Sequence, residues 1–115
     1  YLYKFIMENF MLIENKNLDK GTVVTLKILG GDELVARLDE PYVRGQNAKL
    51  IKPVVVMIGQ QGFGFMPYML TSEEEKVQIP HDYIICVAKT HKGVVDEYIK
   101  QTTGLVSIAS WQLLF

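Results

Sequence analysis

A short stretch between two prolines carries the side chains best suited to hold a nucleic acid. Between Pro41 and Pro53 there are three basic residues and no acidic ones, and one aromatic ring and two side-chain amides lie among them. Cations can pair with phosphates while a base stacks on an aromatic ring, and such stacking is typically worth ~1–3 kcal/mol per base. The stretch therefore predicts a loop that binds single-stranded nucleic acid, and the alternative is an ordinary solvated loop. The loop residues expected to touch the nucleic acid are Tyr42, Arg44, Gln46, Asn47 and Lys49.

The other polar residues do not form an arrangement typical of an enzyme. A nucleophile needs an oriented base beside it, and neither histidine lies near Cys86 or near a serine in a recognisable context. His81 and Asp82 are adjacent, so in a strand they would face opposite sides, and no second pair has the spacing of metal ligands. The acidic residues Glu73 to Glu75 are consecutive, which is typical of a charged surface loop. The sequence therefore predicts no catalytic residue, no metal site and no cofactor.

The composition is that of one small globular domain. The chain has 115 residues, of which 49% are hydrophobic and 22% are charged. A chain of this length can bury a core without metals or disulfides. The formal net charge is -1, so bulk charge does not favour nonspecific binding to nucleic acid. Only a local basic patch could bind it.

Cysteine usage and hydropathy predict the cellular compartment of the chain. The single Cys86 cannot form an internal disulfide, which favours a reducing, cytoplasmic setting. No apolar run reaches the roughly 18–20 residues that a membrane-spanning helix needs, so no membrane partner is expected. Residues 1–10 are apolar but lack a small-residue cleavage pattern, so we expect no secretory signal and take Met7 or Met11 as the expected initiator.

Two neighbouring segments of alternating polarity predict a β-hairpin. In residues 22–29 and in residues 33–38, apolar residues occupy every second position and so lie on one face, which is typical of half-buried strands. Gly30 and Gly31 between them can adopt positive φ without steric cost and so suit the turn. The residues expected to point into the core are Val24, Leu26, Ile28, Leu34, Ala36 and Leu38.

Three further strands and a helix complete the predicted domain. Residues 50–58 and 63–70 form the third and fourth strands, and residues 77–88 form a fifth strand interrupted by Pro80. Apolar residues at helical spacing predict a helix over about residues 92–103. The first dozen residues have near-helical spacing and predict a short N-terminal helix. The apolar tail 105–115 is expected either to fold back onto the strands or to lie between subunits.

Eight residues of the hairpin form a hydrophobic strand, a glycine turn and a leucine-bearing strand: Val24, Leu26, Gly31, Asp32, Glu33, Leu34, Val35 and Leu38. This order resembles the first motif of the Sm/Lsm family, which includes the bacterial Hfq proteins. The likeness is good over residues 22–38, loose to the end of the fifth strand and absent in the tails. It implies a mainly β fold, a small five-stranded, strongly bent antiparallel Sm-like barrel over about residues 20–89, within a single domain of residues 1–115. Tailed bacteriophages also encode small, divergent members of this family, and the resemblance fits such an origin for this chain.

The resemblance does not reproduce the family's RNA pocket residue for residue. The family motif continues with an aspartate and then an asparagine that helps to hold a base, but here Asp39 comes too early and Asn47 too late. The place of the second motif makes His81 the sixth candidate RNA-binding residue, and a structural role in the fifth strand is the alternative for His81 and Tyr83. The resemblance implies single-stranded RNA as the ligand and a closed ring of subunits joined strand to strand.

Unpaired strand edges also predict a homo-oligomer. Five strands of about six to nine residues make a barrel too small to close without open edges. Pairing the fourth strand of one subunit with the fifth strand of the next would satisfy those edges and could close a ring. The alternative function is a protein–protein assembly module without nucleic-acid binding, because the apolar residues exceed what five short strands usually need. The side chains expected in the interface are Phe63, Phe65, Tyr83 and Ile85.

Overall fold

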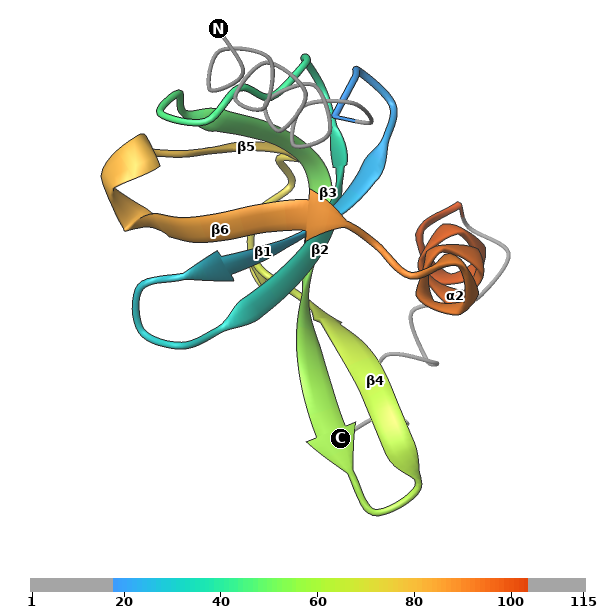
Figure 1. Ribbon diagram of the computed structural model, residues 1–115. Coiled ribbons are helices and arrows are strands. Elements are labelled where there is room, and N and C mark those ends of the chain that lie inside the picture. The colour runs from blue at the N-terminus through green and yellow to red at the C-terminus, as the bar shows by residue number, and fades with distance from the viewer. Residues whose placement is uncertain (1–17, 104–115) are drawn as a thin grey trace, which may run out of the picture.

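The computed structural model describes residues 18–103, which form a curled antiparallel sheet with one helix packed against it (Figure 1). This part of the chain is mainly β, as the sequence predicts. In chain order the elements are β1 (Val23–Ile28), β2 (Glu33–Leu38), β3 (Ala48–Gly59), β4 (Gly62–Pro67), β5 (Lys76–Ile79), the 3-10 turn η1 (His81–Tyr83), β6 (Ile84–Lys89) and α2 (Lys92–Thr102).

β1 and β2 form the predicted hairpin. They pair antiparallel, with Leu26 opposite Leu34. Gly30 and Gly31 in the turn have φ values of 99° and 94°. L-residues with a side chain are strained at such angles, so the turn depends on glycine. All six hairpin residues predicted to point inward are buried in one cluster, which confirms the period-two interpretation.

β3 is longer than predicted and contains a bulge. Its first half pairs with β5 and its second half with β4. Against β2 the register shifts, so that Ala36 stands opposite two residues, Lys52 and Pro53. Lys52 has a positive φ of 49°, and the extra residue changes the face on which later side chains lie. Leu50 and Val55 therefore both reach the inner core, although strict alternation would place them on opposite faces.

The predicted fifth strand is wrong in one respect, because it consists of two strands with different partners. β5 pairs with β3, whereas β6 pairs with β1. Pro80 stands between them and precedes η1. Proline cannot donate to a strand ladder and its ring fixes φ, so the chain turns here instead of continuing. The sheet has six strands instead of five, and His81 and Tyr83 lie in the turn.

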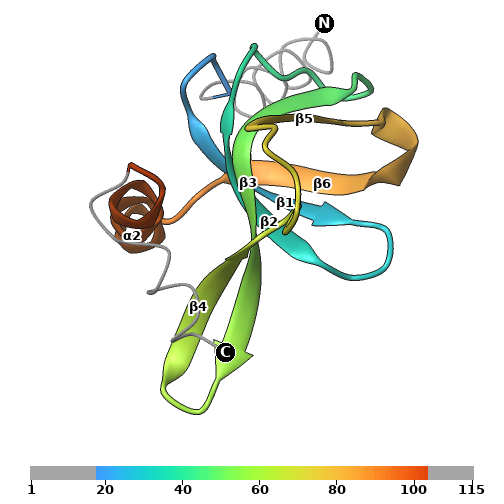
Figure 2. The same ribbon diagram turned by 180° about the vertical axis from the view of Figure 1, so that it is seen from behind.

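β4 and β6 are the end strands of the sheet, whose order is β4-β3-β2-β1-β6, with β5 beside β3. Figures 1 and 2 show that the sheet curls, so that β5 and β6 run along the same side of the molecule and η1 joins them at one end. Within residues 18–103, β5 pairs only with β3 and β6 only with β1, so no strand pair closes the sheet into a barrel.

Two clusters of buried side chains occupy the two faces of the sheet. The larger one fills the inside of the curl and includes the inward residues of β1 and β2. The smaller one joins the outer face to α2 and consists of Val23, Val35, Val54, Phe65 and Tyr98. α2 begins where the sequence predicts and ends one residue before the predicted end. Figure 2 shows it beside the sheet, on the side away from the turn that joins β5 and β6.

Two further predictions, the short N-terminal helix and the apolar tail 105–115, fall outside the described residues. Among residues 18–103, no helix has the length and apolar character needed to cross a membrane.

Candidate nucleic-acid pocket and sheet edges

A pocket of about 400 Å³ opens between β6, the η1 turn and the loop before β3. It brings together three of the six candidate RNA-binding residues, Tyr42, Arg44 and His81. The wall formed by β6 includes Ile85 and Cys86. A rim with cationic and imidazole groups over an apolar wall has the chemistry to hold a phosphate and a base. The fold therefore places together residues that are about 40 positions apart in the sequence.

Asn47 braces this pocket. Its Oδ1 atom accepts a hydrogen bond of 2.9 Å from the backbone N–H of His81. The His81 imidazole lies 3.1 Å from the Asp82 carboxylate, measured from Nδ1 to Oδ1, and both side chains are exposed. The loop before β3 and the η1 turn are therefore tied by a specific contact between two residues that the sequence analysis singled out for RNA binding.

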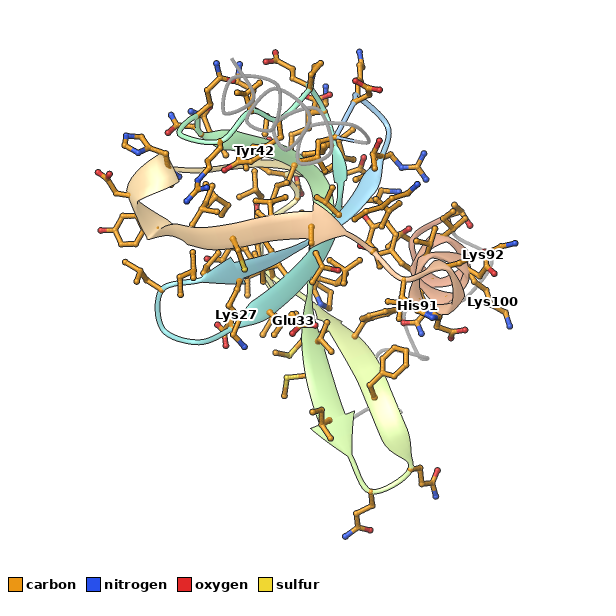
Figure 3. All side chains as sticks on the ribbon, viewed as in Figure 1. Lys27, Glu33, Tyr42, His91, Lys92 and Lys100 are labelled. Atoms are coloured by element: carbon orange, nitrogen blue, oxygen red, sulfur yellow. The ribbon has the colours of Figure 1, made fainter. Side chains whose placement is uncertain are left out.

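Tyr42 does not offer its ring as an open stacking surface. The residue is buried and belongs to the inner core cluster. Burial raises the pKa of its hydroxyl, and the Arg44 charge and a backbone hydrogen bond with Gly45 oppose that shift. Figure 3 shows Tyr42 at the end of the sheet opposite the β3–β4 hairpin. Its contribution to the pocket is one wall, and stacking on an exposed Tyr42 ring, as the sequence predicts, is not available in this structure.

The remaining two candidates, Gln46 in the loop and Lys49 in β3, are not part of the pocket lining. Gln46 is exposed, and its backbone N–H donates to the Val43 carbonyl at 3.1 Å. The Lys49 ammonium pairs with the Glu40 carboxylate at 3.2 Å. Lys49 also borders a second, smaller hollow of about 230 Å³ beside β5. The six candidates are therefore grouped as three pocket residues, one brace and two outlying residues.

Three of the four predicted interface side chains lie on the surface, in the end strands β4 and β6 and in the η1 turn. Phe63, Tyr83 and Ile85 are 49%, 56% and 58% exposed. Phe65 is fully buried, so the prediction that its side chain lies in an interface is wrong for this structure. Its ring packs edge-to-face against Tyr98 of α2, with 6.4 Å between centroids. Phe63 and Phe65 lie on one face of β4, but α2 covers only Phe65.

Sequence reasoning missed the role of Tyr98. Its hydroxyl lies 2.9 Å from the Ile51 carbonyl oxygen and 2.8 Å from that of Lys52, at the bulge of β3. Burial raises the pKa of Tyr98 to about 12, and a backbone hydrogen bond from Arg37 and the charge of that residue act in the opposite direction. A bulge leaves backbone groups without ladder partners, and the single hydrogen of this hydroxyl is shared between the two carbonyl oxygens. Its place on the apolar helical face was the only signal in the sequence.

Within residues 18–103, no three histidine, cysteine, aspartate or glutamate side chains are grouped so that they could hold a metal ion. No family model matches the chain, and no curated protein matches it.

Proposed function

We propose that this chain is the subunit of an Sm-like homo-oligomeric ring, in which β4 of one subunit pairs with β6 of the next. The exposure of β6 carries the proposal. Five of its six residues are apolar, yet none of the six is buried. Apolar strand residues contribute to stability when a neighbour removes them from water. A β4 strand from another copy would do so and would pair the free backbone edge as well.

The composition of the two end strands supports the proposal. Natural edge strands are usually protected by lysines, other charges or prolines that repel a second strand. From Pro53 to Leu70, a segment that includes all of β4, there is no charged residue. In β6 the only charged residue is Lys89 at its end. Apart from Pro67 and Lys89 at their last positions, neither end strand therefore carries the usual protection.

The positions of the two edges favour a ring over an isologous dimer. β4 and β6 are different strands at opposite ends of one sheet. Contact between unlike surfaces is heterologous, and successive copies form a ring when the rotation between them closes. The curl of the sheet, visible in Figures 1 and 2, turns the two edges relative to each other and supports closure.

The native mass of the full chain tests the assembly. We expect a discrete oligomer at micromolar concentration, and we expect Ile85→Lys to reduce it to a single chain with an unchanged circular dichroism spectrum. Leu70→Lys is the matched control, because Leu70 is also exposed and apolar but lies outside β4 and β6. A monomeric unmodified chain, or equal loss of mass in both variants, would show that the two edges do not join subunits.

Single-stranded RNA is the ligand that we propose for the pocket. Arg44 and His81 at one hollow support it, because a cation can pair with a phosphate while the apolar β6 wall meets a base. In a ring the pocket would be repeated in every subunit, so weak contacts would add through effective concentration. The burial of Tyr42 favours the second candidate, an assembly module that binds no nucleic acid, because the expected stacking ring is covered.

The salt dependence of binding separates these two candidates. For single strands, log K falls with log salt with a slope of about −0.7 per phosphate contact. We expect a short oligoribonucleotide to bind the ring with such a slope, and we expect Arg44→Ala to reduce its magnitude by about 0.7 per site. Assembly without RNA binding predicts no retained oligonucleotide at low salt, and no RNA released by nuclease treatment of the purified ring.

A further inference from the structure

One face of the β3–β4 hairpin is apolar along its whole length but covered over only part of it. Directly paired residues on antiparallel strands share a face. The pairs Val56↔Phe65 and Ile58↔Phe63 therefore lie on one side, which is the side of α2. Phe65 is fully buried beneath the helix, whereas Ile58 is 89% exposed. Figures 1 and 3 show the hairpin extending well beyond the rest of the sheet.

A row of aromatic rings connects the covered part of this face to the open part. Tyr98 of α2 packs edge-to-face on Phe65, with 6.4 Å between centroids. Phe65 packs in the same way on Phe63, with 5.5 Å between centroids. The buried cluster beneath α2 therefore continues, without a polar break, into the exposed strip formed by Ile58 and Phe63. A surface of this kind is the continuation of a core.

From this continuity we infer that residues 104–115 of the same chain lie on the strip formed by Ile58 and Phe63 and extend the cluster that α2 begins. The sequence of this segment fits the strip. Eight of its twelve residues are apolar and none is charged. The hairpin between Pro53 and Leu70 is also uncharged. Neither surface would have to remove a charge from water on contact, and that removal is the main cost of burying polar groups.

The end of α2 starts the segment at the correct place. The Lys52 ammonium donates a hydrogen bond of 2.7 Å to the carbonyl oxygen of Thr102. The helix therefore ends beside the middle of β3. From there Ile58 is six residues further along the strand, which is about 20 Å. Twelve residues span about 18 Å as a helix, which stops just short of Ile58, and at most about 40 Å when extended, so the segment reaches the whole strip only if at least part of it is extended.

The same chain is a better occupant than a second copy. A segment joined directly to α2 has an effective concentration in the millimolar range at the strip, whereas another copy competes at its free concentration. The strip and the proposed ring contact are different surfaces. The strip is one face of the hairpin, with Ile58 on β3, whereas the ring would pair the backbone edge of β4.

Trp111, the only tryptophan in the chain, reports on the segment directly. In the full chain we expect blue-shifted emission and a several-fold lower acrylamide quenching constant than in the urea-unfolded chain. Ile58→Asp should raise the quenching constant toward the unfolded value. Met57→Asp is the matched control, because Met57 is also exposed but points to the opposite face of the hairpin, and it should leave Trp111 unchanged. Quenching of the native chain equal to that of the unfolded chain, or no response to Ile58→Asp, would overturn the inference.

Cross-linking identifies which chain supplies the segment. In a Cys86→Ser background, Ile58→Cys combined with Leu113→Cys should oxidise to a disulfide within one chain. A mixture of tagged and untagged chains should give no disulfide between chains of different mass. Adding Ile85→Lys, which tests the ring, should not change this result. A product that joins two chains would show that a second copy covers the strip and would overturn the assignment to the same chain.

Discussion

The Oδ1 atom of Asn47 accepts a hydrogen bond from the backbone N–H of His81, although the two residues are 34 positions apart. The bond joins the loop before β3 to the turn before β6, which form two sides of the candidate pocket. It fixes the separation of these two sides. The loop is also held by the Tyr42 N–H, which donates to the Leu18 carbonyl, and the turn by the Tyr83 carbonyl, which accepts from the Leu29 N–H. The Asn47 bond adds a direct link between the two.

Removing the Asn47 side chain should loosen the pocket. We expect Asn47→Ala to lower the free energy of unfolding by ~0.5–1 kcal/mol, near the lower part of the range for a hydrogen bond, because the bond is exposed. Urea unfolding measures the change. Asn47→Asp keeps an acceptor oxygen at the same place and should retain most of the stability. Equal stability of Asn47→Ala and the unmodified chain would show that the bond does not brace the loop.

The Tyr98 hydroxyl should contribute more to stability than the Asn47 bond, because it is buried at a bulge. Tyr98→Phe keeps the ring against Phe65 but leaves the part-buried carbonyl oxygens of Ile51 and Lys52 with fewer partners. We expect a loss of ~1–3 kcal/mol, the usual cost of an unsatisfied buried group. Thr102→Val, in which a bond from the Thr102 hydroxyl to the Tyr98 carbonyl is lost, should cost less. A loss for Tyr98→Phe smaller than that for Thr102→Val would contradict this account of the bulge.

Alkali should destabilise the fold through the same hydroxyl. Burial raises the pKa of Tyr98 from 10.0 to about 12. Between these values the unfolded chain loses the proton and the folded chain keeps it, so stability is full below pH 10 and falls as the pH rises toward 12. The loss due to Tyr98 should approach ~2–3 kcal/mol. Because other groups titrate equally in Tyr98→Phe, the difference in unfolding free energy between the two chains isolates the effect. This difference should shrink from pH 9 to pH 12, and a constant difference would refute the assignment.

Local patterns in the sequence were sufficient for some elements of the fold. The hairpin is predicted correctly because alternation and a glycine turn are both local signals, and the spacing of apolar residues places α2 within one residue. The division of the fifth strand is not predictable in this way. Pro80 indicates an interruption of the strand. That the chain also changes direction there follows from the separate pairing of β5 with β3 and of β6 with β1, which is a tertiary feature.

The candidate site was predicted in part, for similar reasons. A basic loop identifies Arg44 from composition alone, but burial of Tyr42 depends on core residues distant in the sequence. The bulge at Lys52 has no residue-type signal, because lysine is not typical of positive φ. Phe63 and Phe65 share a face, but only Phe65 is buried beneath α2, where its ring meets Tyr98. These features are set by tertiary packing.

Cys86 provides a direct probe of the β6 edge. It is exposed and lies in the strand proposed to pair with another subunit. In the assembled protein we expect a maleimide to react with Cys86 at least several-fold more slowly than in the Ile85→Lys variant. Dilution below the assembly concentration should accelerate the reaction of the unmodified chain. Equal rates at all concentrations would indicate that β6 stays open to solvent.

Substitutions at Lys52 separate backbone strain from helix capping. Lys52 has a φ of 49°, which costs ~1–2 kcal/mol for a residue with a side chain. Its ammonium donates to the Thr102 carbonyl oxygen at the end of α2, a position where a cation is worth ~0.3–1 kcal/mol. Lys52→Met keeps the strain and loses the charge, so it should be less stable than the unmodified chain by about that amount. Lys52→Gly also loses the charge but relieves the strain, so it should be more stable than Lys52→Met by ~1 kcal/mol in urea unfolding. The reverse order would show that the lysine stem, through packing, outweighs the strained backbone at the bulge.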